Sequence, residues 1–257
     1  MSTLESHTFF PAILILIIMS VHALTYPSTE SKEYSKARYH YLLQIIFGET
    51  IAIDYCRKMS AFAPNAYARD FLLKQQREED IHLELLTAYV GSHPRNDSQV
   101  SPYLRTMDKE MSNAIERKDY EACVFIQNFI VEGLNISFLR ELEHHTDGAL
   151  SELSGKILNE EIGHMEFGVS EVTRMLKEDK TGVLRKRFLT LQRTILYNSV
   201  GLSFDLAREA KDLGIPLPEF VNNTVKEHFE RTRVAGLRLP LIDRIFFKGV
   251  IVLFTVV

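Results

Sequence analysis

The sequence predicts an all-α protein, and three observations support this fold class. From Ser31 onward, apolar residues recur with the spacing of a helix face in nearly every segment. No stretch alternates polar and apolar residues for long enough to require a β-sheet. The 257 residues include only 12 Gly and 8 Pro, a composition that suits long helices joined by short connections. We therefore expect a helical bundle with one large core.

In the first half of the chain, Pro and Gly mark where the helices end. A first helix is expected at about residues 33–60, and Ala63-Pro64-Asn65 breaks it because Pro cannot continue a helix. A second is expected at about 66–90 and stops at Gly91-Ser92-His93-Pro94. Residues 95–101 read as a polar linker, followed by a short amphipathic helix and then a longer one at about 120–144.

The second half follows the same pattern. Thr146-Asp147-Gly148 predicts a turn, and a helix is expected at about 149–177. Residues 178–182 form a loop before a helix that reaches from 184 to 213. The run Gly214-Ile215-Pro216-Leu217-Pro218 ends it, and a last helix is expected at about 219–238.

Composition excludes some classes of function. The formal net charge of −4 gives no basic surface for nucleic acid. The chain has two cysteines, Cys56 and Cys123, which are too few for a disulfide framework and favour a reducing compartment. We expect Cys56 to lie in the core or in a channel wall rather than to bind a metal.

The two ends of the chain are apolar and divide it into three parts: an N-terminal segment (1–30), the helical domain (31–239) and a C-terminal tail (240–257). Residues 9–24 are almost uninterruptedly apolar but short for a membrane span. A secretory leader, an anchor and a helix of the fold all remain open, although no Lys or Arg precedes the segment as in most leaders. The tail reads as a segment lying on the core or on a membrane surface.

Two matched sequence patterns predict a metal site. Glu161 and His164 stand at i and i+3 and so share one side of a helix, and Glu79 and His82 repeat this pair. A lone Glu in an apolar run precedes each pair, Glu49 by 30 residues (79 − 49) and Glu132 by 29 (161 − 132). Such intervals suit two helical hairpins. Together they would place four carboxylates and two imidazoles at one level of a four-helix bundle, the arrangement of di-iron and di-manganese carboxylate proteins.

The chemistry of these residue types supports that interpretation over a solvated helix face. Divalent iron or manganese takes carboxylate oxygen and imidazole nitrogen, and four carboxylates roughly balance two such ions. Without metal, carboxylates in the apolar runs around Glu49 and Glu132 would be costly to bury. A third pair, Glu141 and His144, lies nine residues past Glu132 and hence on the opposite side of that helix, so we expect it at the surface.

With these residues identified, the chain resembles the cyanobacterial aldehyde-deformylating oxygenases from about residue 34 to 239. The matching stretches are Gly48-Glu49, Glu79 with His82, Cys123 to Gln127 running into Glu132, Glu161 with His164, Asp205 to Arg208, and Asp212 to Gly214. The resemblance implies a ferritin-like bundle with additional C-terminal helices and six metal and catalytic residues: Glu49, Glu79, His82, Glu132, Glu161 and His164. It also implies two irons, dioxygen as co-substrate and conversion of long-chain fatty aldehydes to alkanes or alkenes with release of formate. The implied partners are a ferredoxin-type electron donor and an acyl-carrier-protein reductase that supplies the aldehyde.

Departures from the family leave the substrate open. Asn135 stands where a small apolar residue is usual and is expected to bond to a metal ligand or a substrate oxygen, while Leu139 replaces an aromatic. Another di-iron oxidase or hydroxylase of an apolar substrate is the main alternative, and a ferroxidase or storage protein and an inactive bundle are weaker ones. A substrate channel would take its walls from among the core residues near the acids: Ile45, Ile46, Phe47, Ile53, Leu83, Leu86, Phe125, Phe129, Ile136 and Leu139. Of these, Leu139 is expected beside the substrate's tail.

The glycosylation sequon Asn135-Ile136-Ser137 bears on the compartment. It lies one turn from Glu132, so modification there would disrupt the bundle. A secreted enzyme would also lose its cytosolic electron donor. We therefore expect a cytoplasmic protein, resting on a membrane surface through residues 9–24.

Overall fold

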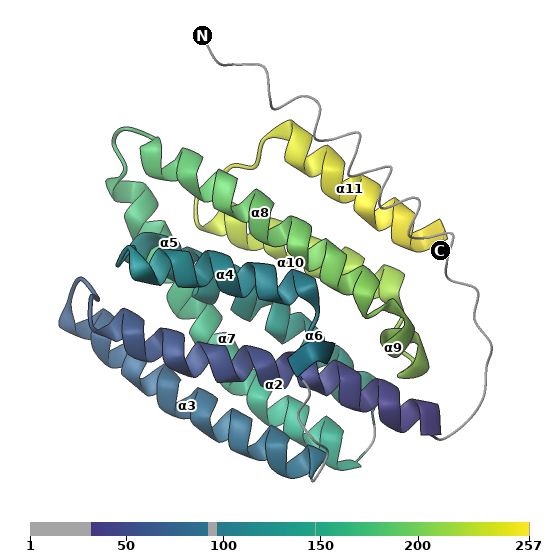
Figure 1. Ribbon diagram of the computed structural model, residues 1–257. Coiled ribbons are helices and arrows are strands. Elements are labelled where there is room, and N and C mark those ends of the chain that lie inside the picture. The colour runs from purple at the N-terminus through teal and green to yellow at the C-terminus, as the bar shows by residue number, and fades with distance from the viewer. Residues whose placement is uncertain (1–31, 92–96, 147, 257) are drawn as a thin grey trace.

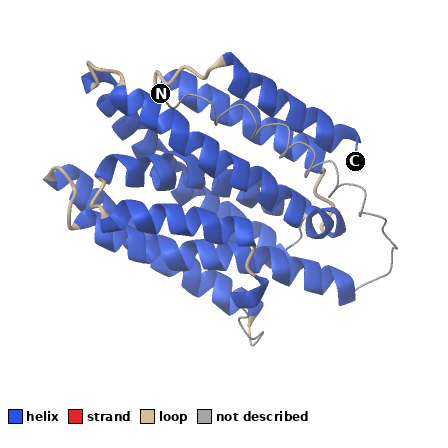
Figure 2. Ribbon diagram, turned by 45° about the horizontal axis from the view of Figure 1, so that its top comes forward, coloured by secondary structure: helices blue, strands red, loops and turns tan. Residues whose placement is uncertain are grey.

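The computed structural model describes residues 32–91, 97–146 and 148–256, and all the regular secondary structure in these ranges is helical (Figures 1 and 2). The predicted all-α fold class is confirmed. The elements are, in chain order, α2 (Lys32–Ser60), α3 (Ala66–Val90), η1 (Asp97–Gln99), α4 (Pro102–Glu116), α5 (Tyr120–Val124), η2 (Phe125–Val131), α6 (Glu132–His145), α7 (Gly148–Glu178), α8 (Val183–Asp205), α9 (Ala207–Asp212), α10 (Leu217–Val234) and α11 (Leu241–Val256).

Polar side chains cap the starts of several helices, as the sequence breaks suggest. The Asn65 side chain accepts a hydrogen bond from the backbone N–H of Ala68 (2.9 Å) and begins α3. Ser101 caps α4 in the same way, with Pro102 in the first turn where its missing N–H costs nothing. Gly182 precedes α8 with φ of 71°, a left-handed conformation that favours glycine. Local sequence therefore sets where these helices begin.

Two helical hairpins form the central bundle. One consists of α2 and α3, and the other of the continuous α5–η2–α6 rod with α7. Helix α7 also packs on α3, which joins the hairpins. Helix α4 lies against α2 and α8, while α8, α10 and α11 form the upper layer in Figure 1. The stretch Tyr120–His145 is apolar and long enough to span a membrane, but 83% of its most apolar window is buried inside the protein, as in a core helix.

Two predicted helices differ from the structure. The helix expected at 184–213 is interrupted at Leu206, where φ of −97° and ψ of 7° separate α8 from α9. The helix expected at 120–144 contains a π-helical segment, η2. Neither interruption coincides with a Pro or Gly residue, so no sequence signal marks either of them.

The apolar C-terminal tail forms α11, which covers α10. Phe247, Val250 and Phe254 are buried on its inner side, while Leu241 and Val252 are exposed. The N-terminal segment at 9–24 lies outside the described residues.

Candidate metal centre

The structure brings the six predicted site residues together in the middle of the bundle. Glu49 lies on α2, Glu79 and His82 on α3, Glu132 at the start of α6, and Glu161 and His164 on α7. Each is at most 2% exposed. They form two overlapping groups in which one ligand atom per residue lies within 4.8 Å of all the others: Glu49, Glu79, His82 and Glu161, and Glu79, Glu132, Glu161 and His164.

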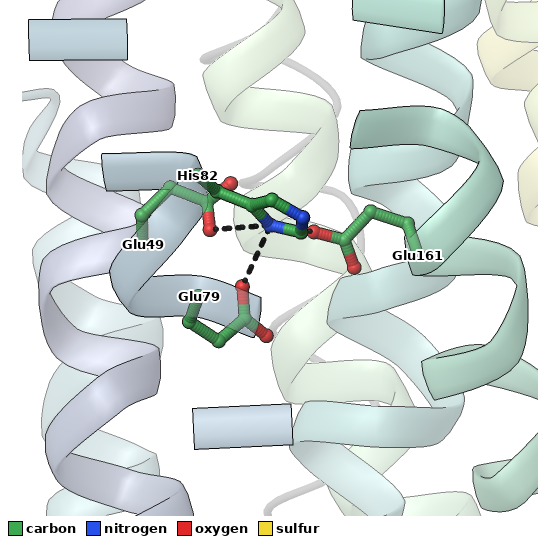
Figure 3. A group of neighbouring side chains, drawn as sticks. All are labelled: Glu49, Glu79, His82 and Glu161. Atoms are coloured by element: carbon green, nitrogen blue, oxygen red, sulfur yellow. Dashed lines mark hydrogen bonds and ion pairs between the residues drawn. The ribbon is translucent and has the colours of Figure 1, made fainter. Parts of the chain in front are cut away.

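The first group surrounds one imidazole nitrogen with carboxylates (Figure 3). His82 Nδ1 lies 3.3 Å from Glu79 Oε2, 3.4 Å from Glu161 Oε1 and 3.5 Å from Glu49 Oε2. These carboxylates come from three different helices and converge on one point. The convergence is that of a ligand set around a single ion.

The second group shares two carboxylates with the first. His164 Nδ1 lies 3.0 Å from Glu161 Oε2 and 3.4 Å from Glu79 Oε1, so both acids present one oxygen to each histidine. Glu132 completes this group only, as Glu49 completes only the other. The geometry therefore suits Glu79 and Glu161 as bridges between two metals, with Glu49 and Glu132 as terminal ligands.

Two further carboxylates, which sequence reasoning missed, hold the outer edges of the imidazoles. His82 Nε2 lies 2.7 Å from Glu160 Oε2, and His164 Nε2 lies 3.1 Å from Glu78 Oε2. Each acid comes from the opposite hairpin and directly precedes a predicted ligand. Such a bond fixes the ring and leaves Nδ1 facing the metal position. The signal was present in the sequence as a double Glu-Glu-x-x-His.

A buried amide network supports the other side of the cluster. Gln75 Nε2 donates to Glu79 Oε1 (3.0 Å) and to Glu132 Oε1 (2.7 Å), and Gln127 Nε2 donates to the same oxygen of Glu132 (2.9 Å). Asn128 Nδ2 in turn donates to Gln75 Oε1 (2.7 Å). The network therefore orients Glu79, the shared acid, and Glu132, the acid of the second group only.

The π-helical segment η2 places part of this network. It ends at Val131, directly before Glu132, and carries Gln127 and Asn128 towards the cluster. Gly168 of α7 allows the close approach, because a Cβ there would lie 2.5 Å from the backbone of Asn128.

Burial and mutual repulsion raise the pKa values of two carboxyls. Burial raises the pKa of Glu49 well above its ordinary value, and the charge of Glu79 adds to this. Burial, followed by the charge of Glu161, raises the pKa of Glu132 in the same way. Ionised forms of the two terminal acids are therefore disfavoured when only protein surrounds them.

The histidines carry compensating charge. Burial opposes ionisation of Glu161, but hydrogen bonds from His164 and His82 outweigh it and hold the pKa of Glu161 at about 2. Burial likewise lowers the pKa of His164, yet its bonds with Glu161 and Glu78 raise that pKa to about 11. Protons on the imidazoles thus occupy the positions from which a bound metal would displace them.

This arrangement fits two divalent cations. Glu49 Oε2 is buried without a hydrogen-bond partner among the described residues, and the nearest ring nitrogen, His82 Nδ1, lies 3.5 Å away, so a cation bound there would offset the cost of its burial. Carboxylate oxygens and imidazole nitrogens suit iron and manganese alike. The donor set therefore matches a dinuclear centre without selecting the metal, and ligation by the six residues stays a prediction.

An apolar cavity opens onto the cluster, and the empty space in it and at its open mouth together is about 870 Å³. It runs beside α2 from Tyr41 to Tyr55, a helical rise of about 21 Å at ~1.5 Å per residue. Glu49, Glu79, Glu132 and Asn135 border it midway. Asn135 Nδ2 donates to Glu161 Oε1 (3.1 Å) and more weakly to Glu49 Oε1 (3.4 Å), so the predicted bond to ligand carboxylates is present.

Most of the ten channel candidates are core residues, as expected for most of them, whereas the placement of Leu139 beside the cavity is wrong. Of the ten candidates only Ile45 borders the cavity, and the walls come instead mainly from α2, α4, α6 and the end of α8. Leu139 is fully buried elsewhere in the core. It shares the face of Glu132, which borders the cavity, but the other α6 residues in the wall are Leu134, Asn135 and Phe138, so the cavity extends round the helix away from Leu139. Cys56 is fully buried and outside the cavity wall.

The third Glu-x-x-His pair takes no part in the cluster, as expected. Glu141 pairs with His145 (3.3 Å), and the ring of exposed His144 bonds to the carbonyl of Arg140 (2.7 Å). Its sequence spacing alone separated it from the true pairs.

The comparisons with known proteins concern the fold. The sequence matches no protein-family model and no curated protein. Its structure is similar to that of a Synechococcus protein described as "Protein 19 with aldehyde deformylating oxidase activity", with a TM-score of 0.73 and 16% sequence identity over 81% of this chain and 93% of that one. The described residues thus adopt the ferritin-like fold of that protein, and they bury carboxylates and imidazoles grouped as in a dinuclear metal centre.

Proposed function

We propose that this protein is a dioxygen-dependent di-iron enzyme that converts long-chain fatty aldehydes to alkanes or alkenes and formate. The observation that carries the proposal is the six-residue cluster at the side of an elongated apolar cavity. The reaction balances when one aldehyde and one dioxygen take up four electrons and three protons to give hydrocarbon, formate and water. A ferredoxin-type donor is the proposed electron source, and an acyl-carrier-protein reductase the proposed source of aldehyde.

The cavity favours an enzyme over an iron store. A storage protein needs acids that lead iron inward, whereas the walls here are apolar along most of their length. Outside the cluster the one acid in the wall is Asp108, and the Tyr55 hydroxyl donates a hydrogen bond to it. An apolar wall excludes water and binds alkyl chains, which an oxygen-activating site requires.

The chain's own residues would bind and orient the substrate. Burial of the alkyl tail supplies affinity, at about 0.8 kcal/mol per methylene. Asn135 stands where the tail's reactive end meets the acids, and its amide can hold an oxygen of that end. Glu49, Glu79, Glu132, Glu161 and the two histidines would hold two irons, which supply the electron transfer to dioxygen. Glu78 and Glu160 fix the imidazoles while this happens.

Asn135 also favours the second candidate, a di-iron oxidase or hydroxylase of another apolar substrate. An amide bonded to two of the acids places a polar group where the cavity borders the cluster. Such a group suits an alcohol, amine or acid as well as an aldehyde.

One experiment separates these candidates. Protein loaded anaerobically with ferrous iron is given aldehydes from octanal to octadecanal, dioxygen and a reducing system, and hydrocarbon and formate are measured. The Glu161→Gln variant, in which a bridging carboxylate is lost, is the matched control. Hydrocarbon and formate in equal amounts from the parent protein alone would support deformylation. Dioxygen consumption without hydrocarbon at any chain length would refute it and favour the second candidate.

A further inference from the structure

A second cavity lies behind the first, between α6, α8, α10 and α11, with about 530 Å³ of empty volume. Its walls include Leu196, Val200, Val225, Phe247 and Phe254. It does not touch any of the six site residues, so its role is separate from metal binding.

The hydroxyl groups in the wall of this second cavity are satisfied by the protein. The hydroxyls of Ser199, Ser203 and Thr224 each donate to a carbonyl one turn back in their own helix, at 2.8–3.0 Å. His228 Nε2 lies 3.2 Å from Gln192 Oε1, and burial, together with the charge of Arg231, lowers the pKa of His228 so that the ring is neutral. Its Nδ1 is buried without a hydrogen-bond partner in the part of the chain that the structure describes and is the one unpaired polar atom of these four side chains. The cavity therefore presents almost entirely carbon and suits an alkyl chain.

A single layer of side chains separates the two cavities. Leu134 and Phe138, one turn apart on α6, border both of them. The Phe138 ring packs edge-on against Tyr41 of the first cavity (centroids 5.5 Å apart) and at a tilt against Phe220 of the second (5.0 Å). Aromatic contacts rather than hydrogen bonds therefore hold the dividing ring.

We propose that the second cavity binds the distal part of long alkyl chains whose reactive end lies at the metal cluster, and that Phe138 is the gate between the two cavities. This inference rests on the proposed function, because it assigns the far end of the same substrate. When the Phe138 side chain rotates out of the wall, the two cavities join into one channel. Phe138 then sets the longest chain that binds without this rotation.

The expected signature is a change in how affinity depends on chain length. Each buried methylene strengthens binding about fourfold, so affinity for n-alkanols should rise with length and then level off where the first cavity ends. In the Phe138→Ala variant the wall is open. We expect the levelling point to move to longer chains, with eicosanol bound more than about tenfold tighter than by the parent and decanol within about threefold.

The test measures n-alkanol binding to the full-length protein by displacement of a fluorescent fatty acid, with dioxygen excluded so that no turnover occurs. Adding Val225→Phe to Phe138→Ala refills the second cavity and should return the levelling point to that of the parent. If the variant with Val225→Phe does not fold, Val221→Phe in the same wall replaces it as the substitution that refills the second cavity. Leu142→Ala is the matched control, since Leu142 is buried on α6 but borders neither cavity.

An unchanged levelling point in folded Phe138→Ala would overturn the proposal. So would an equal shift in Leu142→Ala, or a shift that neither filling residue reverses. Because the alkanols do not react, these results are independent of hydrocarbon formation. A protein that shows the expected binding pattern but makes no hydrocarbon would refute the proposed reaction and leave the two-cavity site standing.

Discussion

Replacing Glu49 by Gln should remove one metal and keep the other. Glu49 belongs only to the group around His82, while the second group uses Glu79, Glu132, Glu161 and His164. An amide keeps the size of the side chain but loses the charge that a divalent ion needs. The variant should therefore bind one iron where the parent binds two.

The same substitution should stabilise the metal-free protein. The pKa of Glu49 is raised in the fold, so this carboxyl's contribution to stability is present at low pH and is lost as pH rises from the ordinary value through the raised one. At neutral pH the cost of burying this carboxyl, whose ionised form is disfavoured, opposes folding, and replacing it by an amide should contribute about 1–3 kcal/mol. For a chain of this size that is a rise in Tm of about 2–12 °C.

Metal should remove or reverse the difference in stability between the parent and Glu49→Gln. At a free metal concentration one hundred times the Kd, each site adds about 2.7 kcal/mol. Two sites in the parent therefore give about 5 kcal/mol, or roughly 10–20 °C, and one site in the variant gives half of that. The parent should be less stable than Glu49→Gln without metal and more nearly equal or more stable with it.

Two measurements check this: iron per chain by mass spectrometry, and anaerobic thermal unfolding with and without ferrous or manganous ion. Glu132→Gln is the matched control, because it is the terminal acid of the other group and should also leave one metal. Glu161→Gln removes a bridge and should lose both. If Glu49→Gln still binds two metals, or binds none, the assignment of terminal and bridging acids is refuted. A lower Tm for the metal-free variant would refute the electrostatic reasoning.

Three further predictions concern residues outside the cluster. His40 Nδ1 lies 2.8 Å from Glu209 Oε1, and this bond raises the pKa of His40. The stability that the bond contributes is present below the ordinary pKa of histidine and is lost as pH rises through the raised pKa. In urea unfolding, His40→Gln should therefore cost more stability at pH 6 than at pH 8.5, and an equal cost at both pH values would contradict this. Gly168→Ala should destabilise the protein by about 1–3 kcal/mol, because the added methyl group overpacks against η2. Gly163→Ala, whose Cβ would meet nothing within 4 Å, should be neutral or stabilising. The denaturant midpoints of the two variants and the parent test both expectations. Leu139→Phe should lower Tm by overpacking the core and leave the chain-length dependence of alkanol binding unchanged, since Leu139 borders neither cavity.

The sequence predicted most helices and the site because both depend on local periodicity. The expected helix at 66–90 coincides with α3 (Ala66–Val90), where Asn65 and Gly91 flank a continuous apolar pattern. The six site residues were found because a hairpin returns the chain to the same height, so sequence intervals translate directly into spatial proximity. Sequence intervals therefore predict which residues come together within a helical hairpin. They do not predict contacts that depend on how separate helices pack against one another.

The position of the cavity is a feature that the sequence did not predict, because it depends on packing between helices. Periodicity placed Leu139 on the face of Glu132, which is correct, but it could not tell that the cavity extends from Glu132 round α6 to Asn135 and Phe138 and not along α6 to Leu139. That depends on where α4 and the end of α8 lie, and no local pattern encodes this. Gln75 was missed for a similar reason, since its bond to Glu132 joins residues 57 positions apart.

The repeated hairpin also explains why the outer acids cross over. Glu78 and Glu160 directly precede Glu79 and Glu161, so each projects from its helix about 100° away from the neighbouring ligand. Each acid also stands four residues before its own histidine and so lies only about 40° from it on the same helix face, and this face meets the helix of the other hairpin where α3 packs on α7. Each acid therefore meets the opposite imidazole, and the pairs Glu78–His164 and Glu160–His82 tie the two hairpins together at the level of the metals. Binding of metal and docking of the hairpins thus depend on the same residues, which is why the double Glu-Glu-x-x-His pattern carries information about both fold and site.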